Sequence, residues 1–190
     1  QQDTLADFYS ILAHTSSTQA GFEFCITPWD NRDPGGNFPP HGWFAVEYIG
    51  LLRNMLVREL DGDLHLLGVV SPQWMKPGDR IAVRQAPTDF GVVSVVADVA
   101  AGSMKVAISS RWRQGPRSVI LHLPWFVNAV SATADGRSVA IQRASHGEGQ
   151  QVTLSPDVRK VEIAWSHSAP PKLSYDGTVE RWKQEYRERF

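Results

Sequence analysis

Two segments near the start of the chain have apolar residues at helical spacing. Residues 5–12 follow Asp3 and Thr4, either of which can cap a helix N-terminus. Residues 41–60 carry a wider apolar stripe than one partner helix needs, and Asp61-Gly62 ends the pattern. The sequence therefore predicts two helices in the first third of the chain.

The connection between these helices, residues 15–40, is rich in Gly, Pro, Asn and Asp. A connection of this length is usually functional or disordered. It also contains Phe22, Phe24, Trp29 and Phe38, and disordered segments have few aromatic residues. We therefore expect an ordered loop that covers another part of the protein.

From residue 64 to residue 166 the apolar period changes to two, which is typical of strands. Asp135-Gly136 lies between two of the alternating segments and is a strong hairpin signal. Roughly eight or nine short strands follow one another with no helix between them. This arrangement predicts an antiparallel β-sandwich.

The chain ends in a third helical pattern, over residues 177–189, that is too short to be stable alone in water. The predicted fold class is thus mainly β: a sandwich preceded by a helical hairpin and followed by a short C-terminal helix. We expect three segments. They are a helical hairpin with a long loop at 1–62, a β-sandwich at 63–168, and a linker with an amphipathic helix at 169–190.

Composition excludes several classes of protein. The 190 residues have a formal net charge of -1, whereas nucleic-acid binders usually carry a basic surplus. Cys25 is the one cysteine, so no internal disulfide can form, and no apolar run is long enough to cross a bilayer. The six histidines lack the short spacing of a local metal site. We therefore expect a soluble protein with no metal, cofactor, nucleic acid or membrane partner, in a compartment that the sequence leaves open.

The residues most suited to chemistry lie in the first part of the chain. Indoles that stack on a sugar ring, mixed with groups that bind its hydroxyls, favour carbohydrate recognition, and the candidates are Trp29, Asp30, His41 and Trp43. Glu23 lies between aromatic residues, and burial there would raise its pKa, as a general acid requires. Each candidate also has a purely structural alternative. Glu23 could be a loop carboxylate that hydrogen bonds to the backbone, and Asp30 could stabilise a turn. The two indoles could pack in the core, and His41 could be a polar residue at the helix start.

Three further indoles occur in the β-rich part of the chain, and two of them follow prolines. We expect these indoles to pack over the ends of strands and seal them, and the alternative is that they lie on the surface and stack on a glycan. The residues are Trp74, Trp112 and Trp125. Exposed indoles in one plane would favour stacking on a glycan.

Several segments resemble a known group of proteins in their residue pattern and in their order along the chain. The clearest are His14-Thr15-Ser16-Ser17, Gly21-Phe22-Glu23-Phe24, Pro39-Pro40-His41-Gly42-Trp43 and Ala86-Pro87-Thr88-Asp89-Phe90-Gly91. With the order helix, loop, helix and β-rich tail, residues 5–166 resemble the C-terminal region of bacterial six-hairpin (α/α)6-barrel glycosidase-like proteins. The α-L-rhamnosidases are the nearest named group.

The resemblance implies that residues 1–62 are the last hairpin of a barrel and that the sandwich is its appended accessory domain. In that family the acid and the base come from separate hairpins. Glu23 would be the candidate catalytic residue here, with His41 and Trp43 placed to contact a sugar ring. The chain begins at Gln1 without Met, so we expect it to be processed or cut from a longer glycosidase, and not to be catalytically competent alone.

The expected partners are carbohydrate and the remaining helical barrel of the parent chain. Without that barrel, the apolar face of the 41–60 helix would be exposed and could support self-association. The alternative function is a non-catalytic carbohydrate-binding or structural β-sandwich module.

Overall fold

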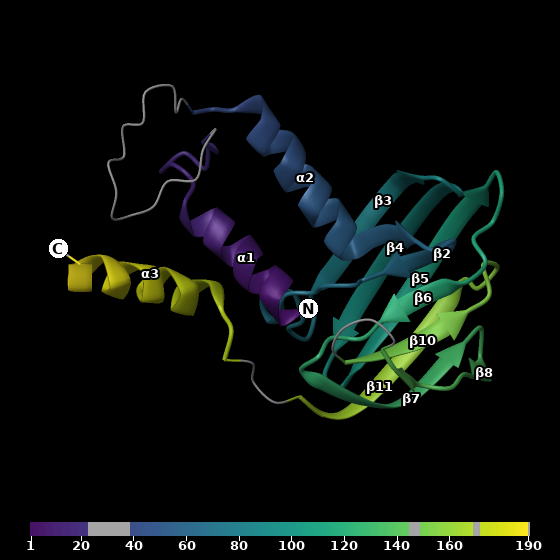
Figure 1. Cartoon of the computed structure of the whole chain (residues 1–190). Helices are drawn as coiled ribbons and strands as arrows, with labels where there is room; N and C mark the ends of the chain where they lie inside the picture. The colour runs from purple at the N-terminus through teal and green to yellow at the C-terminus, as the bar shows by residue number, and fades with distance from the viewer. Residues whose placement is uncertain (23–38, 145–148, 169–171, 190) are drawn as a thin grey trace. The chain divides into compact units, whose positions relative to one another are not determined.

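The computed structural model describes residues 1–22, 39–144, 149–168 and 172–189 (Figure 1). The helices within these ranges are α1 (Gln2–Ala13), α2 (Gly42–Leu56) and α3 (Tyr175–Arg189), with a short 3-10 turn at Pro72–Trp74. All other regular structure in these ranges is β-strand, which confirms the mainly β class.

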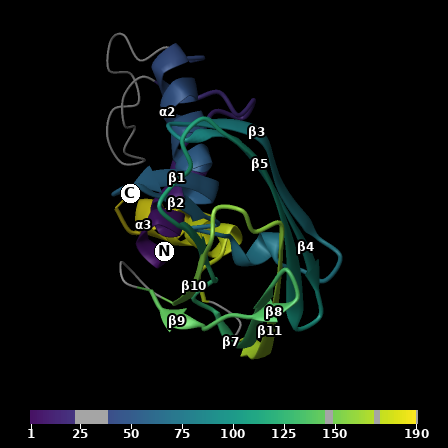
Figure 2. The same ribbon diagram turned by 90° about the vertical axis from the view of Figure 1, so that its right-hand side faces the viewer.

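The strands form two sheets, which Figure 2 shows as separate layers. Sheet A has the order β1 (Val57–Leu60), β2 (Asp63–Leu66), β6 (Val119–His122), β10 (Gln150–Leu154) and β9 (Gln142–Arg143). Sheet B has the order β3 (Arg80–Thr88), β4 (Gly91–Ala100), β5 (Ser103–Trp112), β11 (Lys160–Ser168), β7 (Val127–Ala134) and β8 (Arg137–Ser138). Neighbouring strands are antiparallel except β2 and β6, which are parallel.

The core comes from alternate residues of the strands, as the period of two predicts. On β5 the buried residues Met104, Val106 and Ile108 alternate with more accessible side chains. The buried apolar set includes Leu64, Leu66, Val93, Val95, Val106, Leu121, Val152, Val161 and Ile163. Met55 and Met104, whose apolar surroundings in the sequence also predict burial, are 2% and 1% exposed.

The prediction of helix through residue 60 was wrong. α2 ends at Leu56, and residues 57–60 form β1, which pairs with β2. Asp61 and Gly62 both have positive φ, at 51° and 82°, as a tight two-residue hairpin turn requires. The signal interpreted as a helix stop is therefore a hairpin turn, and pairing with β2 overrides the helical periodicity of the last four residues.

Two other local predictions are confirmed. Asp135 and Gly136, with φ of 46° and 79°, form the turn between β7 and β8. The C-terminal helix is present as α3 and begins two residues before the predicted start, at Tyr175. Both patterns are local, so the sequence alone was sufficient to identify them.

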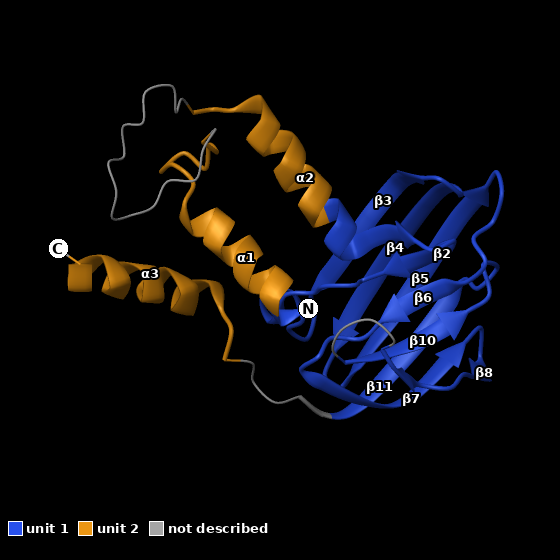
Figure 3. Cartoon of the chain, viewed as in Figure 1, with its two compact units in different colours: residues 1–2, 53–171 blue, residues 3–52, 172–190 orange. Residues whose placement is uncertain are grey.

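The chain divides into two compact units (Figure 3). The sandwich unit contains residues 1–2 and 53–171, and the helical unit contains residues 3–52 and 172–190. In the helical unit, Trp43, Val46 and Ile49 are 75%, 65% and 65% exposed along α2. The stripe for which self-association was expected is a different set, and its members are half-buried or buried: Phe44, Tyr48, Leu51, Leu52, Met55 and Leu56. The association itself stays a prediction.

Candidate functional site

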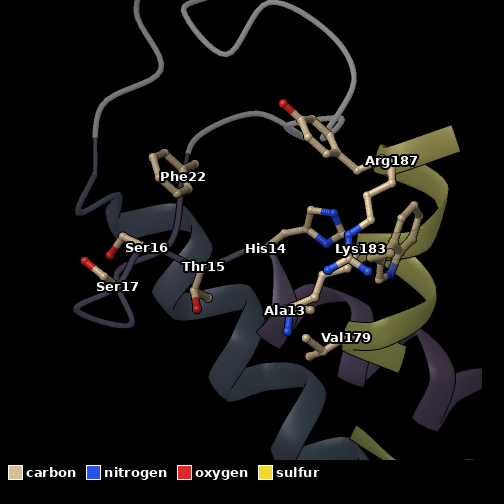
Figure 4. Close-up of a pocket in the computed structure, with 11 residues that line it drawn as sticks. Ala13, His14, Thr15, Ser16, Ser17, Phe22, Val179, Lys183 and Arg187 are labelled. Carbon is tan, nitrogen blue, oxygen red and sulfur yellow. The ribbon is translucent and has the colours of Figure 1, made fainter. Parts of the chain in front are cut away.

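The helical unit contains a pocket of about 790 Å³ at the end of α1 (Figure 4). The end of α1 and the segment after it supply one part of the wall, and α3 supplies the other. The lining residues are Ala13, His14, Thr15, Ser16, Ser17, Phe22, Val179, Trp182, Lys183, Tyr186 and Arg187. Aromatic rings, hydroxyl groups and cationic side chains therefore meet in one place.

The chain turns where α1 ends because polar side chains take over the backbone hydrogen bonds. Thr15 Oγ1 donates to the carbonyl of Leu12 at 2.9 Å and satisfies a group that the helix end leaves open. The N–H of Ala20 donates to Ser16 Oγ, also at 2.9 Å, and Gln19 has a φ of 63°. This turn places several hydroxyl-bearing side chains along the pocket wall.

His14 is oriented by contacts on two sides. Its Nδ1 donates to the carbonyl of Ser10 at 2.7 Å, which leaves Nε2 as the acceptor of the neutral ring. Its ring meets the indole of Trp182 edge-on, with centroids 4.8 Å apart and an interplanar angle of 85°. Trp182 Nε1 in turn donates to Ser10 Oγ at 3.4 Å, so one residue of α1 positions both rings.

One face of α3 forms the second wall. The pocket residues of α3 recur every three or four positions, the spacing that places side chains on one side of a helix. They are Val179, Trp182, Lys183, Tyr186 and Arg187. This side of α3 therefore combines apolar and aromatic side chains with two cations. Tyr186 is 42% exposed, so its ring is accessible to a ligand.

The pocket lining is cationic. It contains Lys183 and Arg187 and, among the residues that the structure describes, no Asp or Glu. Lys183 Nζ lies 2.7 Å from Glu180 Oε1, and this hydrogen bond is the main reason that the pKa of Glu180 is below its usual value. Arg187 has no ion-pair partner within the described ranges.

The predicted site residues that the structure describes do not lie in this lining. Glu23, Trp29 and Asp30 fall in residues 23–38, outside the described part of the chain. His41 and Trp43 are brought together at the start of α2, with ring centroids 6.1 Å apart. Neither belongs to the described pocket wall, and their expected contact with a sugar stays a prediction.

Sequence reasoning did not propose Trp182, Lys183 or Arg187 as site residues. Trp182 has the helical spacing of an apolar stripe, with Val179 and Tyr186, where packing is the usual role. Lys183 and Arg187 have no local sequence signal that separates them from ordinary surface cations of a terminal helix. Only the contact between α1 and α3 reveals that these side chains face His14 across a pocket.

A second polar cluster lies on sheet A in the sandwich unit. Nδ1 of His65 on β2 and Nε2 of His122 on β6 are 2.8 Å apart, and both residues are only 5% exposed. The rings stack with centroids 5.1 Å apart. Burial, followed by the charges of His65, Arg58 and the N-terminal amine, lowers the pKa of His122 to about 4. Gln151, the cross-strand neighbour of His122, is equally buried.

The described residues contain neither a cluster of metal-ligating side chains nor a membrane-spanning helix. Within the described ranges, no three His, Cys, Asp or Glu side chains come together as a metal ion would require. The helices in those same ranges are too short or too polar to cross a bilayer.

The fold and the pocket define a two-sheet β-protein with a helical unit that carries an aromatic, cationic pocket. No family model and no curated protein matches the chain. Among solved structures, part of the chain is similar to a GH127 β-L-arabinofuranosidase from Geobacillus stearothermophilus T6, at 15% identity and a TM-score of 0.39. The match covers 70% of this chain and spans 20% of that protein's length. That protein is a glycosidase, the class that the sequence resemblance names, and a similarity this low adds no argument about function.

Proposed function

We propose that this chain is part of a carbohydrate-active, glycosidase-like protein. In this proposal the helical unit binds a saccharide in the pocket formed by α1 and α3, and the β-sandwich is an accessory domain. The observation that carries the proposal is the composition of the pocket, in which accessible aromatic rings lie beside hydroxyl groups and the His14 imidazole.

This composition suits a sugar because a sugar has two kinds of surface. The apolar C–H face of a pyranose can stack on the ring of Tyr186 or Trp182, which line the pocket. Its hydroxyls need donors and acceptors: the Arg187 guanidinium donates, Nε2 of His14 accepts, and the Ser17 hydroxyl can do both. A purely apolar ligand would leave these polar groups without partners, at a cost in free energy.

The same lining favours binding over hydrolysis. Glycoside hydrolysis generally uses two carboxyl groups on either side of the scissile bond. The described wall of the pocket offers none, so it cannot supply both the acid and the base. A catalytic role for Glu23, with Trp29 and Asp30 as sugar contacts, belongs to the complete parent protein in this proposal.

Calorimetric titration of the 190-residue chain with a panel of neutral and acidic oligosaccharides tests the proposal. We expect binding that weakens about tenfold in Tyr186→Ala, because stacking on one ring contributes roughly 1–1.5 kcal/mol. Tyr186 is partly exposed, so its removal should not affect folding.

Trp43→Ala is the matched comparison, since Trp43 is an accessible aromatic residue outside the pocket lining. Binding that is lost in Trp43→Ala and kept in Tyr186→Ala would move the saccharide to the start of α2 and overturn the pocket assignment. Absence of binding to every oligosaccharide would overturn the carbohydrate function of this unit.

A structural role for the sandwich has its own support. Trp112 is half-buried, and its Nε1 donates to the carbonyl of Pro156 at 3.2 Å. An indole fixed in this way packs over the end of a strand, and less of its ring face is accessible to a glycan than in a fully exposed indole. We therefore propose that the sandwich supports the protein and does not itself bind carbohydrate.

A further inference from the structure

We propose that the pocket of the helical unit selects acidic saccharides, whose carboxylate or sulfate groups pair with Lys183 and Arg187. This inference rests on the proposed function and adds the class of ligand to it. The observation behind it is an imbalance of charge, since the described pocket wall contains two cations and no carboxylate.

The two cations are neighbours on α3. Lys183 and Arg187 are four residues apart, so their side chains project from the same face of the helix. Like charges at this spacing destabilise an isolated helix by roughly 0.2–0.5 kcal/mol. An anion bound between them would remove this repulsion, so the pocket gains more from an acidic ligand than from a neutral one.

Neighbouring carboxylates neutralise the pair only in part. Glu180 lies 2.7 Å from Lys183, and the charge of Arg187 also acts on the Glu180 carboxylate, so one carboxylate faces two cations. Arg187 has no ion-pair partner among the described side chains, which leaves its planar guanidinium able to bind a carboxylate or sulfate through two hydrogen bonds. Arg187 also lies in the last turn of α3, where a cation stabilises the helix end. A purely local role of that kind is the competing explanation.

The rest of the wall specifies a saccharide and not a simple anion. The imidazole of His14 and the ring of Trp182 meet at 4.8 Å, and Tyr186 lies on the same helix face as the cations. An inorganic anion has no apolar surface to place against these rings, whereas a sugar ring bearing a carboxylate or sulfate group matches both features.

The test compares trigalacturonate with galactotriose by calorimetric titration of the complete 190-residue chain, at low and at high salt. We expect the acidic sugar to bind about tenfold more tightly at low salt, and this preference to disappear at high salt because added ions screen the pairing. This comparison needs no variant, so a folding defect cannot confuse it.

The double variant Lys183→Gln/Arg187→Gln should lose the preference for trigalacturonate over galactotriose. Lys172→Gln/Arg143→Gln is the matched control, because it removes the same charge from exposed positions outside the pocket lining. We expect this control to retain the preference. An equal loss in both double variants would show that only net charge matters and would overturn the inference.

The remaining outcomes separate the inference from the proposed function. Equal binding of both trisaccharides in the unaltered chain would overturn the selectivity for acidic sugars and leave saccharide binding intact. Binding of inorganic sulfate without binding of any oligosaccharide would overturn both.

Discussion

At the scale of single residues, His65 and His122 show how a sheet creates a contact that the linear sequence hides. They are far apart in the chain, yet the parallel pairing of β2 with β6 brings their ring nitrogens to 2.8 Å. One ring must donate and the other accept, so at least one is neutral. This arrangement agrees with the lowered pKa of His122.

The His122 pKa of about 4 makes stability depend on pH. In the unfolded chain a histidine binds a proton near pH 6.5, so between pH 6.5 and 4 the unfolded state holds more protons than the folded state. Stability therefore falls as the pH is lowered through this window. We expect a loss of about 2 kcal/mol between pH 7 and pH 5, measured by urea unfolding at each pH.

The variant His122→Gln isolates this effect, because glutamine can hydrogen bond to His65 without titrating. Its stability should change little between pH 7 and pH 5. The lowered pKa values of Glu59 and Asp63, caused mainly by hydrogen bonds from Arg53 and Arg117, produce a loss only when the pH falls below the usual carboxyl range. An equally steep loss in the variant above pH 5 would contradict the assignment to His122.

At the scale of elements, Gly91 shows how closely two strands of sheet B approach. It begins β4 with a φ of 139°, and a Cβ atom placed there would lie 2.2 Å from the carbonyl oxygen of Arg111 on β5. That neighbour is backbone and cannot move aside without breaking the pairing of β4 with β5. A side chain at this position is therefore excluded by both conformation and space.

Gly91→Ala should destabilise the protein by about 2–4 kcal/mol, through strain and loss of strand pairing. Gly115→Ala is the matched control, because its Cβ would make only ordinary contacts, at 3.8–3.9 Å, with Trp112 and Pro156. We expect the control to remain within about 0.5 kcal/mol of the original in denaturant unfolding. Similar losses in the two variants would show that the close approach at Gly91 is not what matters.

The elements also show where sequence reasoning succeeds and where it stops. The turn at Asp135-Gly136 and the alternation of apolar residues along β5 are local signals, so the sequence was sufficient to predict both. The helical period of residues 41–60 predicted helix for residues that form β1, because the period does not report the pairing partner β2. The sequence likewise gave no sign that β2 and β6 run parallel, since strand order depends on contacts between distant segments.

At the scale of the whole molecule, the pocket could not be predicted from the sequence, because it too depends on contacts between distant segments. It needs residues from both ends of the chain, His14 near the start and Trp182 near the end. No local pattern connects them. The candidate residues His41 and Trp43 stood out because they combine polar and aromatic groups within a short segment, which is the kind of signal that a sequence can show.

Removal of residues 172–190 separates the two units experimentally. The buried residues of the sheets belong to the sandwich unit, so the chain 1–171 should keep the sandwich unfolding transition within about 0.5 kcal/mol. Saccharide binding should be lost, because one wall of the pocket is α3. Circular dichroism unfolding and calorimetric titration of the shortened chain measure the two effects. Retained binding would contradict the role of α3, and loss of the sandwich transition would contradict its independence.

The order of strands in the two sheets has a consequence for synthesis of the protein. When β5 leaves the ribosome, β3, β4 and β5 already have one another as neighbours and can pair through short connections. At that moment sheet A has only β1 and β2, since β6, β10 and β9 come later in the chain. β2 must therefore wait with one edge unpaired until β6 arrives, and β5 must wait longer, until β11 arrives. The ten-residue edge of β5 is therefore where a nascent chain of this protein is most exposed to wrong pairing.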